Sequence, residues 1–217
     1  MWLLRLQEAI IFKDIMLKAI IFDVGGVLIR THNWDGRHKW AVRFGLETAE
    51  FERFVFNDES GRQAQLGQKT EKMHWQWLRD YFKLDEAGLA EMRRDFFAGD
   101  RLNEPWVEYI KRLRRAGYRT ALLSNFGDNA RRLWTEVYPF IEYFDGVIIS
   151  AEVGLMKPDP KIYHLALESA GVKPEEALFI DDFIENIEGA RAVGLSTIHF
   201  TDPDRAYQQL AALTGVE

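Results

Sequence analysis

The stretch from Lys18 to Arg30, KAIIFDVGGVLIR, constrains the fold more than any other part of this 217-residue chain. Four apolar residues, Ala19 to Phe22, run without polar alternation up to Asp23, and Gly25 and Gly26 follow. Such a run is typical of a strand that is buried on both faces of a parallel sheet. Functional groups of these sheets gather at the carboxyl ends of the strands, where Asp23 would lie. The glycines predict a tight turn that a ligand can approach closely. Asp23 is therefore a candidate nucleophile or metal ligand.

The composition excludes several other classes of function. With 47% hydrophobic and 29% charged residues, the chain has the balance of a soluble globular protein. The net charge is −6 and no long block of like charge occurs, so a nucleic-acid partner is not expected. The absence of cysteine excludes disulfides and thiolate chemistry and fits a reducing cytoplasm, which is the predicted location.

The first 17 residues are expected to be an N-terminal extension outside the core. Charged side chains interrupt their apolar residues, so the segment is unsuited to spanning a membrane, and it lacks the organisation of a signal peptide. No membrane partner is therefore expected. We predict that deleting residues 1–15 leaves the core intact.

The remainder of the chain divides into two regions with different sequence patterns. Residues 31–99 are rich in Trp and Phe at helical spacing, including the stripes Trp40, Phe44, Phe51 and Phe54, and Met73, Trp77 and Tyr81. From residue 100 onward, short apolar runs alternate with helical patterns. Strands are predicted near 119–123, 144–150, 177–180 and 197–200, with helices near 105–117, 128–137, 159–171 and 183–192. This alternation predicts a parallel sheet covered on both faces. The predicted fold is α/β, a Rossmann-like core formed by 18–30 and 100–217 with an inserted α-helical cap at 31–99.

Polar residues follow three of the predicted strands. They are Asp23, the pair Ser124-Asn125 and the pair Asp181-Asp182, and Lys157 precedes a further helix. Taken singly, each has an ordinary structural explanation as a helix cap or a surface lysine. In a parallel sheet, however, all of them fall along one edge. A nucleophile, a hydroxyl, a cation and paired acids are what phosphoryl transfer requires, and the acids suit Mg²⁺.

The order of these segments is also specific. IIFDVGGVL, LLSN, KPDPKIY and FIDDFIENIEGARAVG resemble the four signature motifs of the haloacid dehalogenase superfamily of hydrolases. The similarity extends from about Lys18 to the last predicted strand, and residues 31–99 fall where that family carries its helical cap.

The resemblance implies a role for each matching residue. Asp23 would be the catalytic nucleophile, forming an aspartyl-phosphate that water hydrolyses, with Ser124 and Lys157 as its catalytic partners. Asn125 and the turn formed by Gly25 and Gly26 would bind the phosphoryl group. A further set would hold Mg²⁺: Asp23, the carbonyl of Gly25, Asp182, and Asp181 directly or through water. Asn186 would support the acidic loop.

Gly25 departs from the family pattern. Phosphatases of the superfamily usually carry an acid/base Asp at this position, and a general acid or base is worth about 10² to 10⁴ in rate. Three interpretations remain open. The substrate could have a leaving group that needs little protonation, since sequences with Gly here resemble glucose-1-phosphate phosphatases. A residue of the cap, His32, Asp35 or His38, could supply the proton. The protein could instead be a slow enzyme or a phosphate-binding relic.

Dehalogenases of the superfamily also lack the second Asp, but they use no metal and do not keep adjacent acids at the position of Asp181-Asp182. The sequence therefore favours a Mg²⁺-dependent phosphatase acting on a small phosphorylated metabolite, with a 2-haloacid dehalogenase and a weak phosphate-binding protein as alternatives. Trp34 and residues near Gly61-Arg62 are the candidates in the cap for facing substrate. Monomer and homodimer both remain open.

Overall fold

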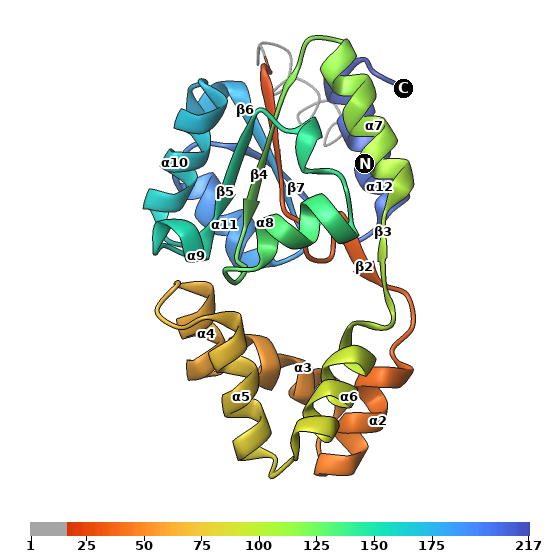
Figure 1. The fold of residues 1–217 in the computed structure, drawn as a ribbon. Helices are drawn as coiled ribbons and strands as arrows, with labels where there is room; N and C mark the ends of the chain where they lie inside the picture. The colour runs from red at the N-terminus through yellow and green to blue at the C-terminus, as the bar shows by residue number, and fades with distance from the viewer. Residues whose placement is uncertain (1–16) are drawn as a thin grey trace, which may run out of the picture.

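The computed structural model describes residues 17–217. The expectation for residues 1–17 therefore falls almost wholly outside the described residues. The predicted α/β class is confirmed, because a five-stranded parallel sheet forms the centre of the molecule in the order β5-β4-β1-β6-β7 (Figure 1). Its strands are β1 (Ala19–Phe22), β4 (Arg119–Ser124), β5 (Gly146–Ile149), β6 (Ala177–Asp181) and β7 (Ser196–His199).

β1 lies at the middle of this sheet because its side chains are apolar on both faces. Ile20 and Phe22 belong to one hydrophobic cluster, and Ala19 and Ile21 belong to the other. The strand pairs in parallel with β4 on one side and with β6 on the other. All four of its residues have no exposed surface, as the uninterrupted apolar run predicts.

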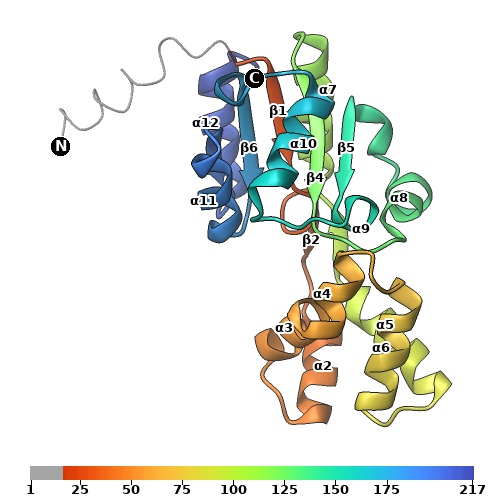
Figure 2. The ribbon, with the colours of Figure 1, turned by 90° about the vertical axis from the view of Figure 1, so that its left-hand side faces the viewer.

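Helices cover both faces of the sheet (Figure 2). One face packs against α7 (Glu104–Arg115) and α12 (Pro203–Thr214), and the other packs against α10 (Pro160–Ala170) and α11 (Ile184–Ala192). Shorter elements complete this part: α8 (Ala130–Arg132), η1 (Leu133–Val137), η2 (Ile141–Tyr143), α9 (Ser150–Val153) and η3 (Pro174–Glu176). The helix predicted at 128–137 is therefore two short elements, of which η1 is a π-helix.

A separate bundle of helices lies beyond the carboxyl edge of the sheet (Figure 1). Its members are α2 (Asp35–Phe44), α3 (Thr48–Asn57), α4 (Glu59–Gln65), α5 (Glu71–Tyr81) and α6 (Glu86–Phe97). They share a hydrophobic cluster that includes Trp40, Phe51, Trp75 and Phe96. That residues 31–99 form a domain in their own right stays a prediction.

The buried face of α5 differs from the expected one. Met73 and Tyr81 are 51% and 56% exposed, whereas His74, Trp75 and Leu78 are buried. The helix itself is correctly placed, and Thr70 caps it by accepting a hydrogen bond from the Met73 N–H. Helical spacing alone could not say which of two adjacent apolar stripes faces the neighbouring helices.

Two short strands connect the bundle to the sheet. β2 (Ile29–Thr31) and β3 (Asp100–Leu102) pair antiparallel, and neither strand was predicted from the sequence. Beside them, Arg37 of α2 is buried and donates to the Asp100 carboxylate at 2.9 Å and to the Phe96 carbonyl at 3.0 Å. It also forms an ion pair with Glu52. One arginine thus ties α2 and α3 to the start of β3.

Candidate active site

The carboxyl edge of the sheet brings the predicted site residues together. Asp23 follows β1, Ser124 ends β4, and Asp181 ends β6, so the three lie on neighbouring strands of the sheet. The Asp23 N–H donates to the Ile180 carbonyl at 2.9 Å, which keeps Asp23 level with the end of β6. All three side chains are buried. The expected convergence at one edge is therefore present in the fold.

Lys157 joins this group from the loop before α10. Its Nζ lies 2.9 Å from Asp23 Oδ1 and 2.6 Å from Asp181 Oδ2, with 1% of its side chain exposed. Burial by itself would lower the pKa of Lys157, but Asp181 and Asp23 outweigh burial and raise the pKa. Lys157 is therefore a fixed positive charge between two acids.

The same loop is held by Asn125. Its Nδ2 donates to the Lys157 carbonyl at 3.0 Å, and its Oδ1 accepts from the Lys157 N–H at 2.8 Å. Both ends of the amide are thus engaged with the main chain of Lys157. The predicted contact between Asn125 and a phosphoryl group stays a prediction.

Asp181 is saturated with partners. Asn186 Nδ2 lies 3.1 Å from both carboxylate oxygens, and the Phe183 N–H donates to Oδ1 at 2.7 Å. With Lys157 on Oδ2, neither oxygen is free of a donor. The support expected from Asn186 is present in these contacts.

Asp182 differs from Asp181, because its Oδ1 is buried without a hydrogen-bond partner among the described residues. Burial, followed by the charges of Asp23 and Asp181, raises the pKa of Asp182 to about 8. Asp182 Oδ1 therefore lacks the hydrogen-bond donor or cation that a buried carboxylate oxygen normally has.

The residues fit a divalent cation. Asp23, Asp181 and Asp182 each offer an oxygen, and these oxygens lie within 4.8 Å of one another. With Lys157, the fully ionised cluster carries two net negative charges, which one divalent cation would neutralise. Carboxylate oxygens are the ligands that Mg²⁺ prefers. The unpartnered Oδ1 of Asp182 would be a free ligand atom for the cation.

The two glycines of the turn have different structural demands. Gly26 has a φ of 72°, and a Cβ there would collide with the Asp182 carboxylate. Gly25 is outside the left-handed region, and a Cβ there would meet no other part of the fold within 4 Å. Gly26 is therefore required by conformation and by space, whereas the fold has room for a side chain at Gly25.

Sequence reasoning missed one residue beside the cluster. His199, which ends β7, places Nε2 2.9 Å from the main-chain carbonyl of Asp182. No sequence signal pairs these residues, because their proximity depends on β7 lying next to β6. His199 helps to fix the main chain that carries Asp182.

The helical bundle contacts the sheet domain close to this edge. The Glu71 N–H at the start of α5 donates to Asp128 Oδ1 at 2.8 Å. Gly67 lies against the Ala151 carbonyl of α9, where any side chain would collide. These contacts place the α4–α5 connection against the loops that follow β4 and β5.

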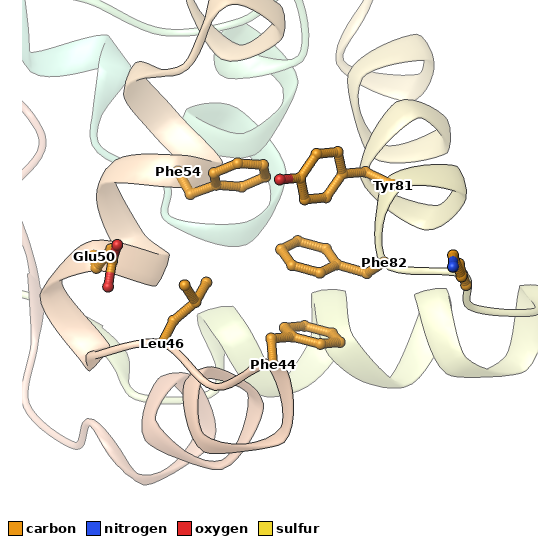
Figure 3. Close-up of a pocket in the computed structure, with 7 residues that line it drawn as sticks. Phe44, Leu46, Glu50, Phe54, Tyr81 and Phe82 are labelled. Carbon is orange, nitrogen blue, oxygen red and sulfur yellow. The ribbon is translucent and has the colours of Figure 1, made fainter.

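A separate hollow of about 470 Å³ lies within the bundle (Figure 3). It is lined by aromatic rings from the ends of α2 and α5, including Phe44, Phe82 and Tyr81. The start of α5 contacts the sheet domain, so this hollow lies at the opposite end of the helix from the acidic cluster. It is not part of the candidate site.

A parallel sheet covered on both faces, with an acidic cluster at its carboxyl edge, defines an α/β protein with a candidate active site at that edge. The chain belongs to the haloacid dehalogenase-like hydrolase family, whose sequence model matches residues 17–194. Among the residues that the structure describes, none form a helix with the length and hydropathy needed to cross a bilayer.

Relatives in the family have different activities. Bifunctional epoxide hydrolase 2 of Sus scrofa is 29% identical over 93% of this chain, but the match covers only 39% of that protein's length. Sesquiterpene phosphatase astK of Aspergillus oryzae is 27% identical, with 91% of this chain and 97% of that protein covered. The (S)-2-haloacid dehalogenase 4A of Burkholderia cepacia is 25% identical, with 84% and 82% covered.

The fold also matches solved structures. A haloacid dehalogenase family enzyme from Bacteroides thetaiotaomicron, in complex with magnesium and inorganic phosphate, superposes with a TM-score of 0.69. It is 24% identical, and the match covers 84% of this chain and 93% of that one.

Proposed function

We propose that this protein is a Mg²⁺-dependent phosphatase that hydrolyses a small phosphorylated metabolite through an aspartyl-phosphate on Asp23. The observation that carries the proposal is the cluster of Asp23, Lys157, Asp181 and Asp182. It combines a buried nucleophile, a fixed cation and an unpartnered acid oxygen. The phosphatase from Aspergillus oryzae and the magnesium and phosphate complex from Bacteroides thetaiotaomicron support it.

Asp23 would act as the nucleophile. Burial raises its pKa to about 6, although Lys157 acts in the opposite direction, so the carboxylate is mainly ionised at pH 7. A carboxylate oxygen attacks phosphorus, and the bond from phosphorus to the substrate's ester oxygen breaks. Water then attacks the same phosphorus, which releases inorganic phosphate and regenerates the carboxylate.

Asp23, Asp182 and the Gly25 carbonyl would hold Mg²⁺ directly, and Asp181 would do so through water because its oxygens already have donors. The ion, when bound, supplies positive charge to the phosphoryl oxygens. Lys157 would supply a further positive charge, and its contact with Asp23 opposes the rise in the pKa of that carboxyl. Ser124 and the main-chain N–H groups of the glycine turn would hold the phosphoryl oxygens in line for attack.

The proton for the leaving group must come from elsewhere, because Gly25 has no side chain. Of the three candidates, Asp35 and His38 have side-chain partners close by in the bundle. His32 is exposed and directly follows β2, in the segment that joins the sheet to α2. We therefore assign the proton to His32 when the leaving group needs one. An anomeric sugar phosphate is a candidate substrate that needs little protonation.

A 2-haloacid dehalogenase is the second candidate, favoured by the relative from Burkholderia cepacia. Halide displacement needs no cation, however, and would leave the Asp182 oxygen unpartnered. A third possibility, from a different class, is a protein that binds phosphate ligands with little turnover.

The deciding experiment measures phosphate release from p-nitrophenyl phosphate with Mg²⁺ and with EDTA. We expect activity only with Mg²⁺, its loss in Asp23→Asn, and its retention in Asp204→Asn, a matched change on the exposed start of α12. Chloride release from 2-chloropropionate in EDTA would establish the dehalogenase instead. Binding of vanadate without turnover of any phosphate ester would leave the binding protein.

His32→Gln tests the proton donor separately. We expect it to slow hydrolysis of an alkyl phosphate, whose alkoxide is a poor leaving group, about 10²-fold or more. Hydrolysis of p-nitrophenyl phosphate should change little, because p-nitrophenolate leaves without a proton. Equal effects on both substrates would show that His32 does not act as the acid.

A further inference from the structure

The edge that carries the acidic cluster also carries exposed apolar side chains. Phe183 and Ile184 directly follow Asp182, and they are 56% and 41% exposed. Large apolar side chains are usually buried, so two in succession beside a polar cluster need an explanation. Capping does not provide one, because Phe183 contributes no side-chain cap to α11 and forms its hydrogen bonds there through the main chain alone.

Phe183 is held rigidly at this place. Its N–H donates to Asp181 Oδ1 at 2.7 Å, and it also accepts main-chain hydrogen bonds from Asn186 and Ile187 in the first turn of α11. The ring is therefore attached to a fixed piece of main chain, one residue from the proposed Mg²⁺ ligand Asp182.

A third exposed apolar side chain belongs to the bundle. Trp34 precedes α2 directly, at the end of that helix joined to β2, and it is 44% exposed. The buried Arg37 lies over its ring, with the guanidinium carbon 5.0 Å from the ring centroid. The ring is thus supported by a buried side chain at the start of α2.

We propose that Phe183, Ile184 and Trp34 contact the organic part of the substrate, which is a hydrocarbon, so that the enzyme prefers phosphate monoesters of apolar alcohols. This inference rests on the proposed phosphatase function. It commits to the substrate as the occupant because Phe183 and Ile184 directly follow the proposed ligand Asp182, and Trp34 lies in the segment that joins β2 to α2. Burial of each methylene against them would be worth up to about fourfold in kcat/KM.

The test uses ethyl, butyl, hexyl and octyl phosphate with Mg²⁺, below the concentrations at which they form micelles. Their leaving alcohols have nearly the same acidity, so a change along the series reports contact with the chain and not chemistry. We expect kcat/KM to rise about two- to fourfold per added methylene until the chain outgrows the contact. A flat or falling series in the wild-type protein overturns the proposal.

Two variants locate the contact. Phe183→Ser and Trp34→Ser should each flatten the series, whereas Phe183→Leu should retain most of the slope. Val42→Ser is the matched control, because Val42 is also on α2 and is 62% exposed, and it should leave the slope unchanged. A slope that persists in both serine variants also overturns the proposal. Circular dichroism establishes whether each variant is folded. If a variant does not fold, the slope of the wild-type series alone tests the proposal.

Failure of this inference is distinct from failure of the proposed function. If neither the alkyl phosphates nor p-nitrophenyl phosphate releases phosphate with Mg²⁺, the phosphatase proposal itself is wrong. If p-nitrophenyl phosphate is hydrolysed but the alkyl series is flat, the phosphatase stands and the hydrocarbon contact does not. In that second case the exposed rings of Phe183 and Trp34 do not contact the substrate.

Discussion

Asp182 is expected to destabilise the metal-free protein, so replacing it with asparagine should make the protein more stable. Its pKa is raised from 3.8 to about 8, with burial as the largest cause and the charges of Asp23 and Asp181 next. An acid with a raised pKa favours folding only at low pH, and this contribution is lost as pH rises from 3.8 toward 8. Asparagine is neutral in both states and carries no such penalty.

The size of the effect follows from the shift. Between 3.8 and pH 7 lie about three pH units, and each is worth about 1.4 kcal/mol, so the full penalty is about 4 kcal/mol. Asp182 is only partly buried and retains some contact with water, which lowers the expected gain to about 2 to 4 kcal/mol. For a chain of this size, that corresponds to a rise in Tm of about 5 to 15 °C.

The assay is thermal and urea unfolding of wild-type protein and Asp182→Asn in EDTA at pH 4 and pH 7. The gain should be present at pH 7 and nearly absent at pH 4. Glu185→Gln removes an exposed carboxylate from the first turn of α11 and should change stability by less than about 1 kcal/mol. A variant less stable than wild type at pH 7, or an equal difference at both pH values, would refute the electrostatic reasoning.

Adding Mg²⁺ should reverse the order. The wild-type protein should gain about 2.7 kcal/mol when Mg²⁺ is a hundredfold above its Kd, and Asp182→Asn should gain little. Because protons compete for the Asp182 carboxylate, whose pKa is raised to about 8, the stabilisation by Mg²⁺ should grow from pH 6 to pH 8. Equal stabilisation of both proteins would show that the ion binds elsewhere.

Three further predictions address other parts of the fold. Gly25→Asp fills free space with an acid, so in a His32→Gln background turnover of ethyl phosphate should rise about 10²-fold while turnover of p-nitrophenyl phosphate stays nearly constant; no gain in a folded variant would mean that the added acid does not reach the leaving group. Asn125→Ala releases the Lys157 main chain and should lower kcat about 10- to 100-fold, with a smaller effect on KM, in steady-state kinetics. Arg37→Met leaves buried acids unpaired and should cost about 3 to 5 kcal/mol in urea unfolding, whereas Arg53→Met on an exposed position should cost less than about 0.5 kcal/mol.

Much of the site could be predicted because its parts are local. Asp23, Ser124 and Asp181 each end an apolar run, and parallel strands place such ends at one edge. That Lys157 bridges Asp23 and Asp181 required the loop before α10 to fold back on the sheet. The Asn125 amide is engaged with the Lys157 main chain, a contact between residues 32 positions apart that no local pattern signals, and its predicted contact with phosphate stays a prediction.

Other features depended on long-range packing and carried no local signal. The contact of His199 with Asp182 exists because β7 lies beside β6. The ion pairs of Arg37 join segments that the sequence separates by up to 63 positions. The buried face of α5 was decided by its neighbours, since two apolar stripes with helical spacing compete on that helix.

The amino-acid sequence by itself determined the α/β class, the central position of β1, the helical character of residues 31–99 and the nature of the acids that follow the strands. These properties arise from hydrophobic periodicity and from turn residues, which act over a few positions. Only the tertiary structure decided which acid is saturated and which is left open. Asp181 and Asp182 are adjacent and chemically identical, yet Lys157 and Asn186 reach only the first of them, and the unpartnered oxygen of Asp182 results from that difference.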